Sequence, residues 1–227
     1  MSGGFLVLLL LIPAMVLHEL SHGYVAHLLG DDTAKNQGRL TLNPLKHVDP
    51  FGSVALPLLL AVGQIATIGH VGFLYGWAKP IPVNTLNLQM NGRANSRRLM
   101  AIVAFAGPAM NFALALLAGL ALHGGVGLDY LLFFIDINLL IGIFNLLPLP
   151  PMDGGRIAVG VLPLALAKIL ARSERVGIFA VLFVLFLLPT ALQQFGVSFD
   201  PFRAAMAQIL PYAERIVLTA TGNGFGN

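Results

Sequence analysis

The sequence predicts an all-α polytopic membrane protein. Of its 227 residues 57% are hydrophobic and only 10% are charged, whereas a soluble domain carries about 25% charged residues. The apolar residues gather in stretches that, with their flanks, approach the roughly 20 residues needed to cross a bilayer. These observations indicate about five to six transmembrane segments with short extended loops, in one domain that covers residues 1–200.

Charge and cysteine content narrow the possible partners and cofactors. Thirteen Lys and Arg against ten Asp and Glu give a net charge of +3, which favours contact with anionic lipid headgroups and is not a nucleic-acid signature. Cysteine is absent. Any metal must therefore be held by His, Asp or Glu side chains.

The first predicted helix covers about Phe5–Leu29. It lacks the basic start of a signal peptide, and ionisable residues stand where a cleavage site would lie, so we expect the helix to be retained. The polar connection after it favours a short strand at Arg39–Leu42. A second apolar segment runs from about Gly52 to Tyr75. Beyond it, prolines predict an extended conformation for Lys79–Val83, which could pair with another extended peptide.

Prolines interrupt the second half of the chain. The predicted helical segments there are Leu99–Leu122, Asp129–Leu147, Arg156–Ala171 with a kink at Pro163, and, after a charged turn at 172–175, Val176–Phe195. Between the second and third of these, residues 149–155 are expected to be irregular. A straight helix over 129–171 would extend about 64 Å, twice the hydrocarbon core. The break must therefore fold back or lie within the membrane, where irregular backbone needs a protein-lined or wet cavity, and it is a candidate site.

The end of the chain differs in composition from the apolar domain. Charged and apolar residues alternate over 201–220, which predicts an interfacial amphipathic helix. Residues 221–227 are rich in Gly and Asn. We expect them to form a disordered tail.

The run His18-Glu19-Leu20-Ser21-His22 has the H-E-x-x-H spacing of zinc peptidases. On a helix, both imidazoles lie on one face and can reach a single Zn²⁺, while Glu19 can act as general base toward a water. The plainer interpretation is a set of interfacial polar residues near a helix end. We favour a functional role, because ionisable groups that follow an apolar run inside a membrane protein are usually functional.

A catalytic zinc usually has three protein ligands, so one further ligand is needed. The available aspartates and histidines are Asp31, Asp32, Asp49, Asp129, Asp136, Asp153 and Asp200, with His27, His47, His70 and His123. Asp153 is the preferred candidate, because it lies in the proline break and Gly154-Gly155 permit a sharp turn beside it. The alternative is that Asp153 caps the helix that follows.

Other polar residues have both a structural and a functional interpretation. Asn111 either hydrogen-bonds across helices or contacts a substrate. His47 and Asp49 either form a gating pair or are solvated loop residues. Asn138 shares one face of its helix with Asn145, seven residues on.

Four linked motifs resemble the site-2 protease family of intramembrane zinc metalloproteases, in its short bacterial or archaeal branch without a PDZ or CBS domain. They are HELSHG at 18–23, LGDDTAKNQGRLTLNP at 29–44, AGPAMN at 106–111 and FNLLPLPPMDGGR at 144–156. The resemblance implies that His18, His22 and Asp153 bind one zinc ion and that Glu19 is the catalytic acid and base. It further implies that Asn145 is catalytic, as a donor to the substrate carbonyl or oxyanion.

The implied function is zinc-dependent endopeptidase activity, in a prokaryotic plasma membrane, on peptide bonds in or next to transmembrane segments of other proteins. The implied partners are a transmembrane protein substrate and the lipid bilayer. A metal transporter would also place His and Asp among helices, but transporters commonly show repeated halves, and this sequence shows one constellation and no repeat. An inactive scaffold relative is disfavoured because all the proposed site residues are intact.

Overall fold

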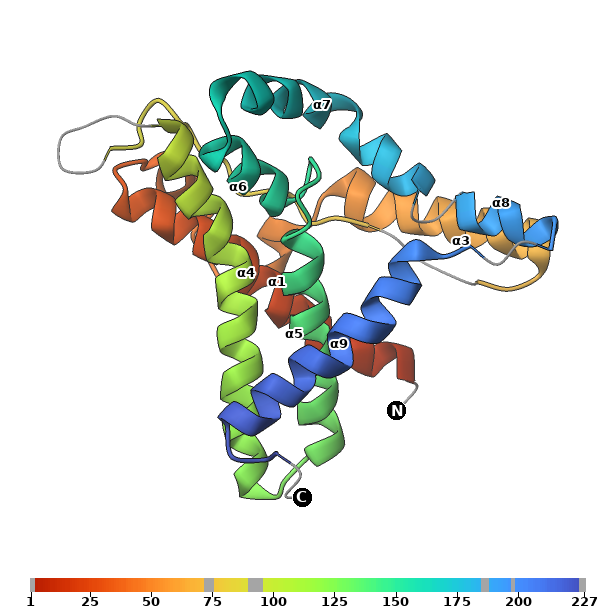
Figure 1. Ribbon diagram of the computed structural model, residues 1–227. Helices are drawn as coiled ribbons and strands as arrows, with labels where there is room; N and C mark the ends of the chain where they lie inside the picture. Colours follow the sequence, from red (N-terminus) through yellow and green to blue (C-terminus); the bar gives the residue numbers. More distant parts are fainter. Residues whose placement is uncertain (1–2, 72–75, 90–95, 185–187, 197–198, 225–227) are drawn as a thin grey trace.

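The computed structural model describes residues 3–71, 76–89, 96–184, 188–196 and 199–224, and over these ranges the fold is helical without any strand (Figure 1). The prediction of an all-α chain is thereby confirmed for this part of the chain. In chain order the elements are α1 (Gly3–Leu28), α2 (Thr33–Asn36), η1 (Pro44–His47), η2 (Pro50–Ala55), α3 (Leu56–Ile68), α4 (Ser96–Ala121), η3 (Leu122–Gly124), α5 (Leu128–Asn145), α6 (Asp153–Val161), α7 (Leu164–Leu182), α8 (Leu188–Gln194) and α9 (Pro201–Ala220).

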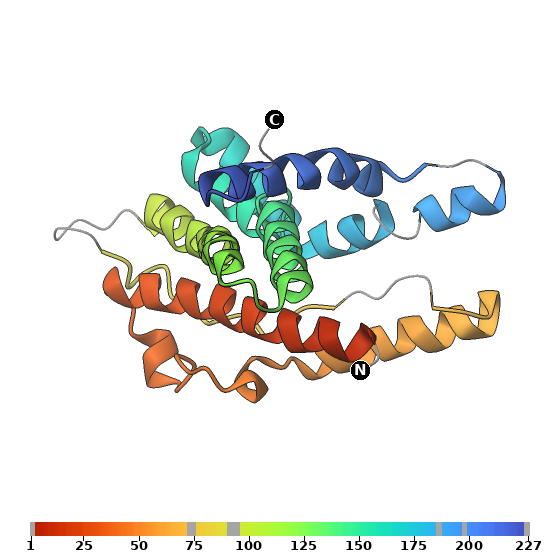
Figure 2. The same ribbon diagram turned by 90° about the horizontal axis from the view of Figure 1, so that it is seen from below.

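Helix α4 is the centre of the packing. It contacts α1, α5 and α6, and α9 packs across both α4 and α5. Figure 2 shows α1 and α9 on opposite sides of the α4–α5 pair. The buried face of α4 is rich in small residues: Ala101, Ala104, Gly107, Ala115, Ala118 and Gly119. Small side chains let neighbouring helices approach closely, so α4 can contact several partners at once.

Among the described residues, three helices are long and apolar enough to cross a membrane: Leu9–Leu28, Ser96–Gly124 and Leu128–Asn145. They correspond to the first, third and fourth predicted segments. The predicted count of five to six spans is not confirmed. The second predicted segment forms a shorter apolar helix, Pro50–Ala66. Helix α3 stops at Ile68, because the next residue, Gly69, is left-handed with a φ of +77°. Residues 72–75 of that segment lie outside the described residues.

The proline break is confirmed, in a shorter form than predicted. Helix α5 ends at Asn145 and α6 begins at Asp153. The expectation that 149–155 would be irregular is wrong for its last three residues, which form the first turn of α6. A glycine at 154 makes this possible, because a Cβ there would lie 2.3 Å from the carbonyl oxygens of both Leu146 and Leu147. The start of α6 therefore packs directly on the end of α5.

The chain after the break also departs from the prediction. Pro163 separates α6 from α7 and does not merely kink one helix, since proline cannot donate the helical hydrogen bond. The predicted charged turn at 172–175 is helical and lies inside α7. Arg and Glu are good helix formers, and no Gly or Pro stands there to end the helix. The predicted last span, 176–195, is divided between α7 and α8, and residues 185–187 lie outside the described part.

The strand predicted at Arg39–Leu42 does not form. The Arg39 side chain is buried and donates from Nη2 to the carbonyls of Lys79 (2.9 Å) and Pro80 (3.3 Å). Bends replace the strand over 40–42. Residues 79–83 form no helix, turn or strand, and their extended conformation stays a prediction.

Helix α9 begins at the N-cap Asp200, whose side chain accepts from the Arg203 backbone N–H at 2.8 Å. It buries Met206, Val217 and Leu218. Beyond it, where we expected disorder, Thr221 is buried, and the Asn223 amide donates to the Gly119 carbonyl at 2.6 Å. These contacts hold residues 221–224 against α4, and residues 225–227 lie outside the described chain. The interfacial position of α9 stays a prediction.

Candidate metal centre and active site

The structure brings together the three predicted metal ligands. His18 and His22 lie one turn apart on α1, and Asp153 opens α6. The Asp153 Oδ2 atom lies 3.1 Å from His18 Nε2 and 3.2 Å from His22 Nε2, and the two Nε2 atoms are 3.2 Å apart. All three side chains are buried. Within the described residues, this is the one group of His and acidic side chains arranged to hold an ion.

The far side of each imidazole is fixed by a carbonyl oxygen. His22 Nδ1 donates to the Val103 backbone carbonyl at 2.7 Å, and His18 Nδ1 donates to Asn111 Oδ1 at 2.5 Å. A carbonyl oxygen only accepts hydrogen bonds, so each Nδ1 carries the proton. In the neutral imidazoles, both Nε2 atoms therefore present a lone pair toward Asp153.

The donor set fits a zinc ion. Each Nε2 atom offers a lone pair and the Asp153 carboxylate offers a charged oxygen. Three electron-rich atoms then converge, which is unfavourable unless a cation lies among them. Tetrahedral ligands at about 2.0–2.1 Å from zinc are about 3.3 Å apart, close to the separations seen here.

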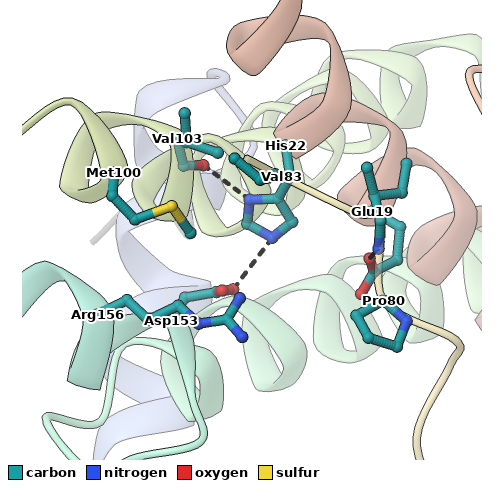
Figure 3. A pocket seen from close by; sticks show the side chains of 9 residues that line it. Glu19, His22, Pro80, Val83, Met100, Val103, Asp153 and Arg156 are labelled. Carbon is teal, nitrogen blue, oxygen red and sulfur yellow. Dashed lines mark hydrogen bonds and ion pairs between the residues drawn. The ribbon is translucent and has the colours of Figure 1, made fainter. Parts of the chain in front are cut away.

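Asp153 is not the cap of its helix. The N-cap of α6 is Met152, and no side chain caps this end. The capping alternative is therefore wrong, and the Asp153 carboxylate is directed at the two imidazoles instead. Figure 3 shows Asp153 directed at His22, with Asp153 and Arg156 reaching the pocket from α6 and Glu19 from α1.

Gly107 of the AGPAMN motif also belongs to the site, which sequence reasoning did not recognise. A Cβ at this position would lie 2.4 Å from His22 Nε2 and 2.6 Å from His18 Nε2. The absent side chain thus leaves open the space beside both nitrogens. Helix α4 continues through Pro108, the next residue of the motif.

Glu19 lies at a small pocket beside the triad. The lining residues are Glu19, His22, Pro80, Ile81, Val83, Met100, Val103, Asp153 and Arg156. Glu19 Oε2 accepts from the Ile81 backbone N–H at 3.0 Å. The carboxylate is therefore held on the pocket wall, near the ligands but outside their cluster.

Asn145 is not among the residues that line the pocket, whereas Arg156 is. The structure does not bring Asn145 to the pocket wall, and its amide donates to the Ile141 carbonyl at 3.0 Å. Its catalytic role stays a prediction. Arg156, which sequence reasoning did not single out, lines the pocket. Its position three residues after Asp153, on the same face of α6, was the signal available in the sequence.

The segment 76–84, which has no regular secondary structure, contributes Pro80, Ile81 and Val83 as one wall of the pocket. The Lys79 N–H donates to the His47 carbonyl at 2.8 Å, and the Ile81 N–H donates to Glu19. The residues between and after them, at 80 and 82, are prolines without a donor. Because these donors are used inside the protein, the segment offers little to a second extended peptide at 79–82.

Asp31, one of the alternative ligands, anchors the segment that follows this wall. It is fully buried and accepts from Thr33 N–H and Oγ1, from the Asn84 N–H at 2.6 Å and from the Asn87 amide at 3.0 Å. Burial raises the pKa of Asp31, but these hydrogen bonds outweigh it and hold the pKa below its ordinary value. Its role is structural.

Several other candidate ligands are also engaged elsewhere. His47 is buried and donates to the Thr41 carbonyl at 2.8 Å, whereas Asp49 caps η2, so the two do not form the suggested pair. His27 pairs with Asp32. His123 Nε2 bonds to the Thr221 carbonyl at 2.7 Å.

Comparison with known proteins agrees with this site. The model of peptidase family M50 matches residues 124–189, which include Asn145 and Asp153. "Putative zinc metalloprotease YwhC" of Bacillus subtilis (strain 168) is 40% identical over 192 residues, which cover 79% of this chain and 78% of the relative.

More distant relatives carry the name "Putative zinc metalloprotease Rip2". The protein of Mycolicibacterium smegmatis is 34% identical over 62% of this chain, and that of Mycobacterium tuberculosis (strain H37Rv) is 30% identical over 78%. The matches span 51% and 64% of these two relatives. No solved structure matches significantly. By its similarity to YwhC and the family match, the chain belongs to peptidase family M50, the site-2 protease family of metalloproteases.

Proposed function

We propose that this protein is a zinc-dependent intramembrane endopeptidase that hydrolyses peptide bonds in or next to transmembrane segments of membrane-protein substrates. One observation carries the proposal. The nitrogens of His18 and His22 and an oxygen of Asp153 converge within 3.2 Å of one another, and Glu19 lines the pocket beside them. Three of these residues, His18, Glu19 and His22, lie in a helix apolar enough to cross a membrane.

His18, His22 and Asp153 are the proposed zinc ligands, one ion to a chain. A bound zinc supplies Lewis-acid chemistry, because it lowers the pKa of a water and polarises a peptide carbonyl. Zinc is also the metal in the names of the relatives. The Gly107 position supports the assignment, since any side chain there would fill the space beside both imidazole nitrogens.

Glu19 is the proposed general acid and base. Its carboxylate takes a proton from the attacking water as the scissile carbonyl is attacked, and then delivers that proton to the leaving amine. The Ile81 N–H holds Oε2 at 3.0 Å. The second oxygen, Oε1, is then the one to face the substrate.

Negative charge that develops on the substrate carbonyl oxygen needs donors. Asn145 is the donor implied by the family motif, and Arg156 is the cationic group among the pocket-lining residues. If Asn145 is the donor, Asn145→Ala should lower turnover; if Arg156 is the donor, Arg156→Gln should lower it.

The membrane setting follows from the apolar helices. The proposed location is a prokaryotic plasma membrane, as a multi-pass protein with the site reached through the pocket between α1 and α6. A peptide bond in a substrate helix is protected by the helix's own hydrogen bonds. The substrate must therefore unwind before it reaches the triad. The transporter and scaffold alternatives have no observation in their favour, because the described residues hold one triad with a neighbouring acid.

The test compares wild type with Glu19→Gln in lipid vesicles, using tagged single-pass proteins as substrates and measuring zinc by mass spectrometry. Glu19→Gln should abolish cleavage with zinc content nearly unchanged, whereas His22→Ala should lose both. Glu214→Gln on α9 makes the same chemical change outside the pocket and should cleave normally. A tenth of wild-type turnover in Glu19→Gln, a barrier change of only about 1.4 kcal/mol, would contradict the assignment.

A further inference from the structure

Two buried asparagines connect the proposed ligand His18 to the far side of the bundle. Asn111 on α4 and Asn138 on α5 are both 0% exposed. Asn111 Oδ1 accepts from His18 Nδ1 at 2.5 Å, and Asn111 Nδ2 donates to Asn138 Oδ1 at 2.9 Å. Asn138 Nδ2 donates in turn to the Phe134 backbone carbonyl at 2.8 Å. The chain of hydrogen bonds thus runs from α1 through α4 to α5.

The hydrogen bond from Asn138 to the Phe134 carbonyl fixes which atom donates and which accepts in the other hydrogen bonds of the series. The Phe134 carbonyl only accepts, so the Asn138 amide nitrogen must face it, and the Asn138 oxygen must face Asn111. Asn111 then presents its nitrogen to Asn138 and its oxygen to His18. With an oxygen opposite, His18 Nδ1 must carry the proton, and Nε2 has a lone pair available for a metal.

We infer that Asn111, held by Asn138, is a positioning residue that fixes the tautomer and ring orientation of His18 for metal binding. This inference rests on the proposed function, in which His18 is a zinc ligand. Metal-binding histidines usually donate their second N–H to such an acceptor, which orients the ring and raises its basicity. For His22 the Val103 backbone carbonyl serves the same purpose.

The competing explanation is that the asparagines only hold the helices together, as amides between membrane helices often do. The Asn111 nitrogen also lies 3.5 Å from the Ala14 carbonyl, which is a weak contact with α1. A packing role depends on the amides as a pair. A positioning role depends specifically on an acceptor at residue 111, and the two can therefore be separated by substitution.

The experiment measures zinc affinity by competition with a chelator for wild type and three variants. Asn111→Leu removes the acceptor at similar volume. Asn111→Asp keeps an oxygen opposite His18 Nδ1 and loses the donor to Asn138. Asn138→Leu keeps Asn111 but frees its amide to rotate. Gln64→Leu on α3 removes an amide from another apolar helix as the matched control.

Positioning predicts a graded series. Asn111→Leu should bind zinc about 10- to 100-fold more weakly, Asn138→Leu should show a smaller loss, and Asn111→Asp and Gln64→Leu should stay close to wild type. Nitrogen spectra of ¹⁵N-histidine-labelled, zinc-free protein add a readout independent of activity. They should show His18 protonated at Nδ1 in wild type, and a tautomer mixture in Asn111→Leu.

Two results would overturn the inference. One is wild-type zinc affinity in Asn111→Leu, and the other is an equal loss in Asn111→Asp and Asn111→Leu, because packing alone explains an equal loss. If Asn111→Leu does not fold, the tautomer of His18 is measured in Asn138→Leu instead. An unchanged single tautomer there would contradict the inference, because Asn138 would then not fix the orientation of the Asn111 amide. Failure of the wild-type protein itself to bind zinc would contradict the proposed function instead.

Discussion

Adding one methyl group at Gly107 should disable the metal centre. In Gly107→Ala the new Cβ would lie 2.4 Å from His22 Nε2 and 2.6 Å from His18 Nε2, about 1 Å inside ordinary contact. It would lie beside both nitrogens, in the space that a zinc ion needs in order to bind them at about 2.0–2.1 Å. The imidazoles have little freedom to move away, because Val103 and Asn111 hold their Nδ1 atoms.

We expect Gly107→Ala to lower zinc affinity by at least about 100-fold, or about 2.8 kcal/mol. Cleavage of a tagged single-pass substrate should fall at least as far, since a displacement of about 1 Å alone can cost about 100-fold in rate. The assay is zinc content per chain at fixed free zinc, followed by turnover in vesicles.

Gly63→Ala on α3 is the matched control. A Cβ at Gly63 meets no atom within 4 Å, and alanine in a helix interior is favoured over glycine by about 0.5–1 kcal/mol. This variant should keep its zinc, its turnover and its stability. Full zinc occupancy with normal turnover in Gly107→Ala would refute the reasoning, because the imidazoles would then be able to move away from the added methyl group and still bind zinc.

Substitutions at three further positions, Asn145, Arg156 and Asp31, give additional tests. Asn145→Ala should lower turnover about 100-fold or more with zinc still bound if its amide reaches the substrate carbonyl; near-normal turnover would make it a helix-packing residue. Arg156→Gln should lower kcat about 100-fold at unchanged zinc content, with partial recovery in Arg156→Lys, whereas an unchanged kcat would exclude the guanidinium from catalysis. At pH 7, Asp31→Asn should lower the free energy of unfolding by about 2 kcal/mol, the magnitude for hydrogen bonds to a charged group. Denaturant titration measures this as unfolding at a lower concentration. Because the folded pKa of Asp31 is depressed, its contribution is present above the unfolded value of about 3.9 and is lost as the pH falls through the folded pKa. The gap between wild type and Asp31→Asn should therefore narrow below about pH 4, and a gap independent of pH would contradict this account.

The local features of the site could be predicted from the sequence because they depend on spacing along one helix or on one residue type. The i, i+4 spacing alone places His18 and His22 on one face of α1, and prolines alone end α5 before Asp153. Hydrophobic runs of sufficient length likewise predicted the three helices that can cross a membrane. These predictions hold because helical periodicity and the missing proline donor act within a few residues.

The predictions that failed required knowledge of distant neighbours. The strand at 39–42 is lost to a buried arginine that bonds a segment 40 residues away. Asp153 could equally have been a helix cap by its local sequence, and only its approach to α1 decides that it faces the imidazoles.

The sequence by itself determined which side chains can do zinc chemistry, since those residue types and their spacing are local properties. The tertiary structure decided which of them meet. His18 meets Asn111 and Asp153 across 93 and 135 residues of chain, and Gly107 gains its importance solely from the two rings packed against it. Such contacts follow from how closely α1, α4 and α6 approach one another. That approach depends on the packing of all three helices, and no short window of sequence specifies it.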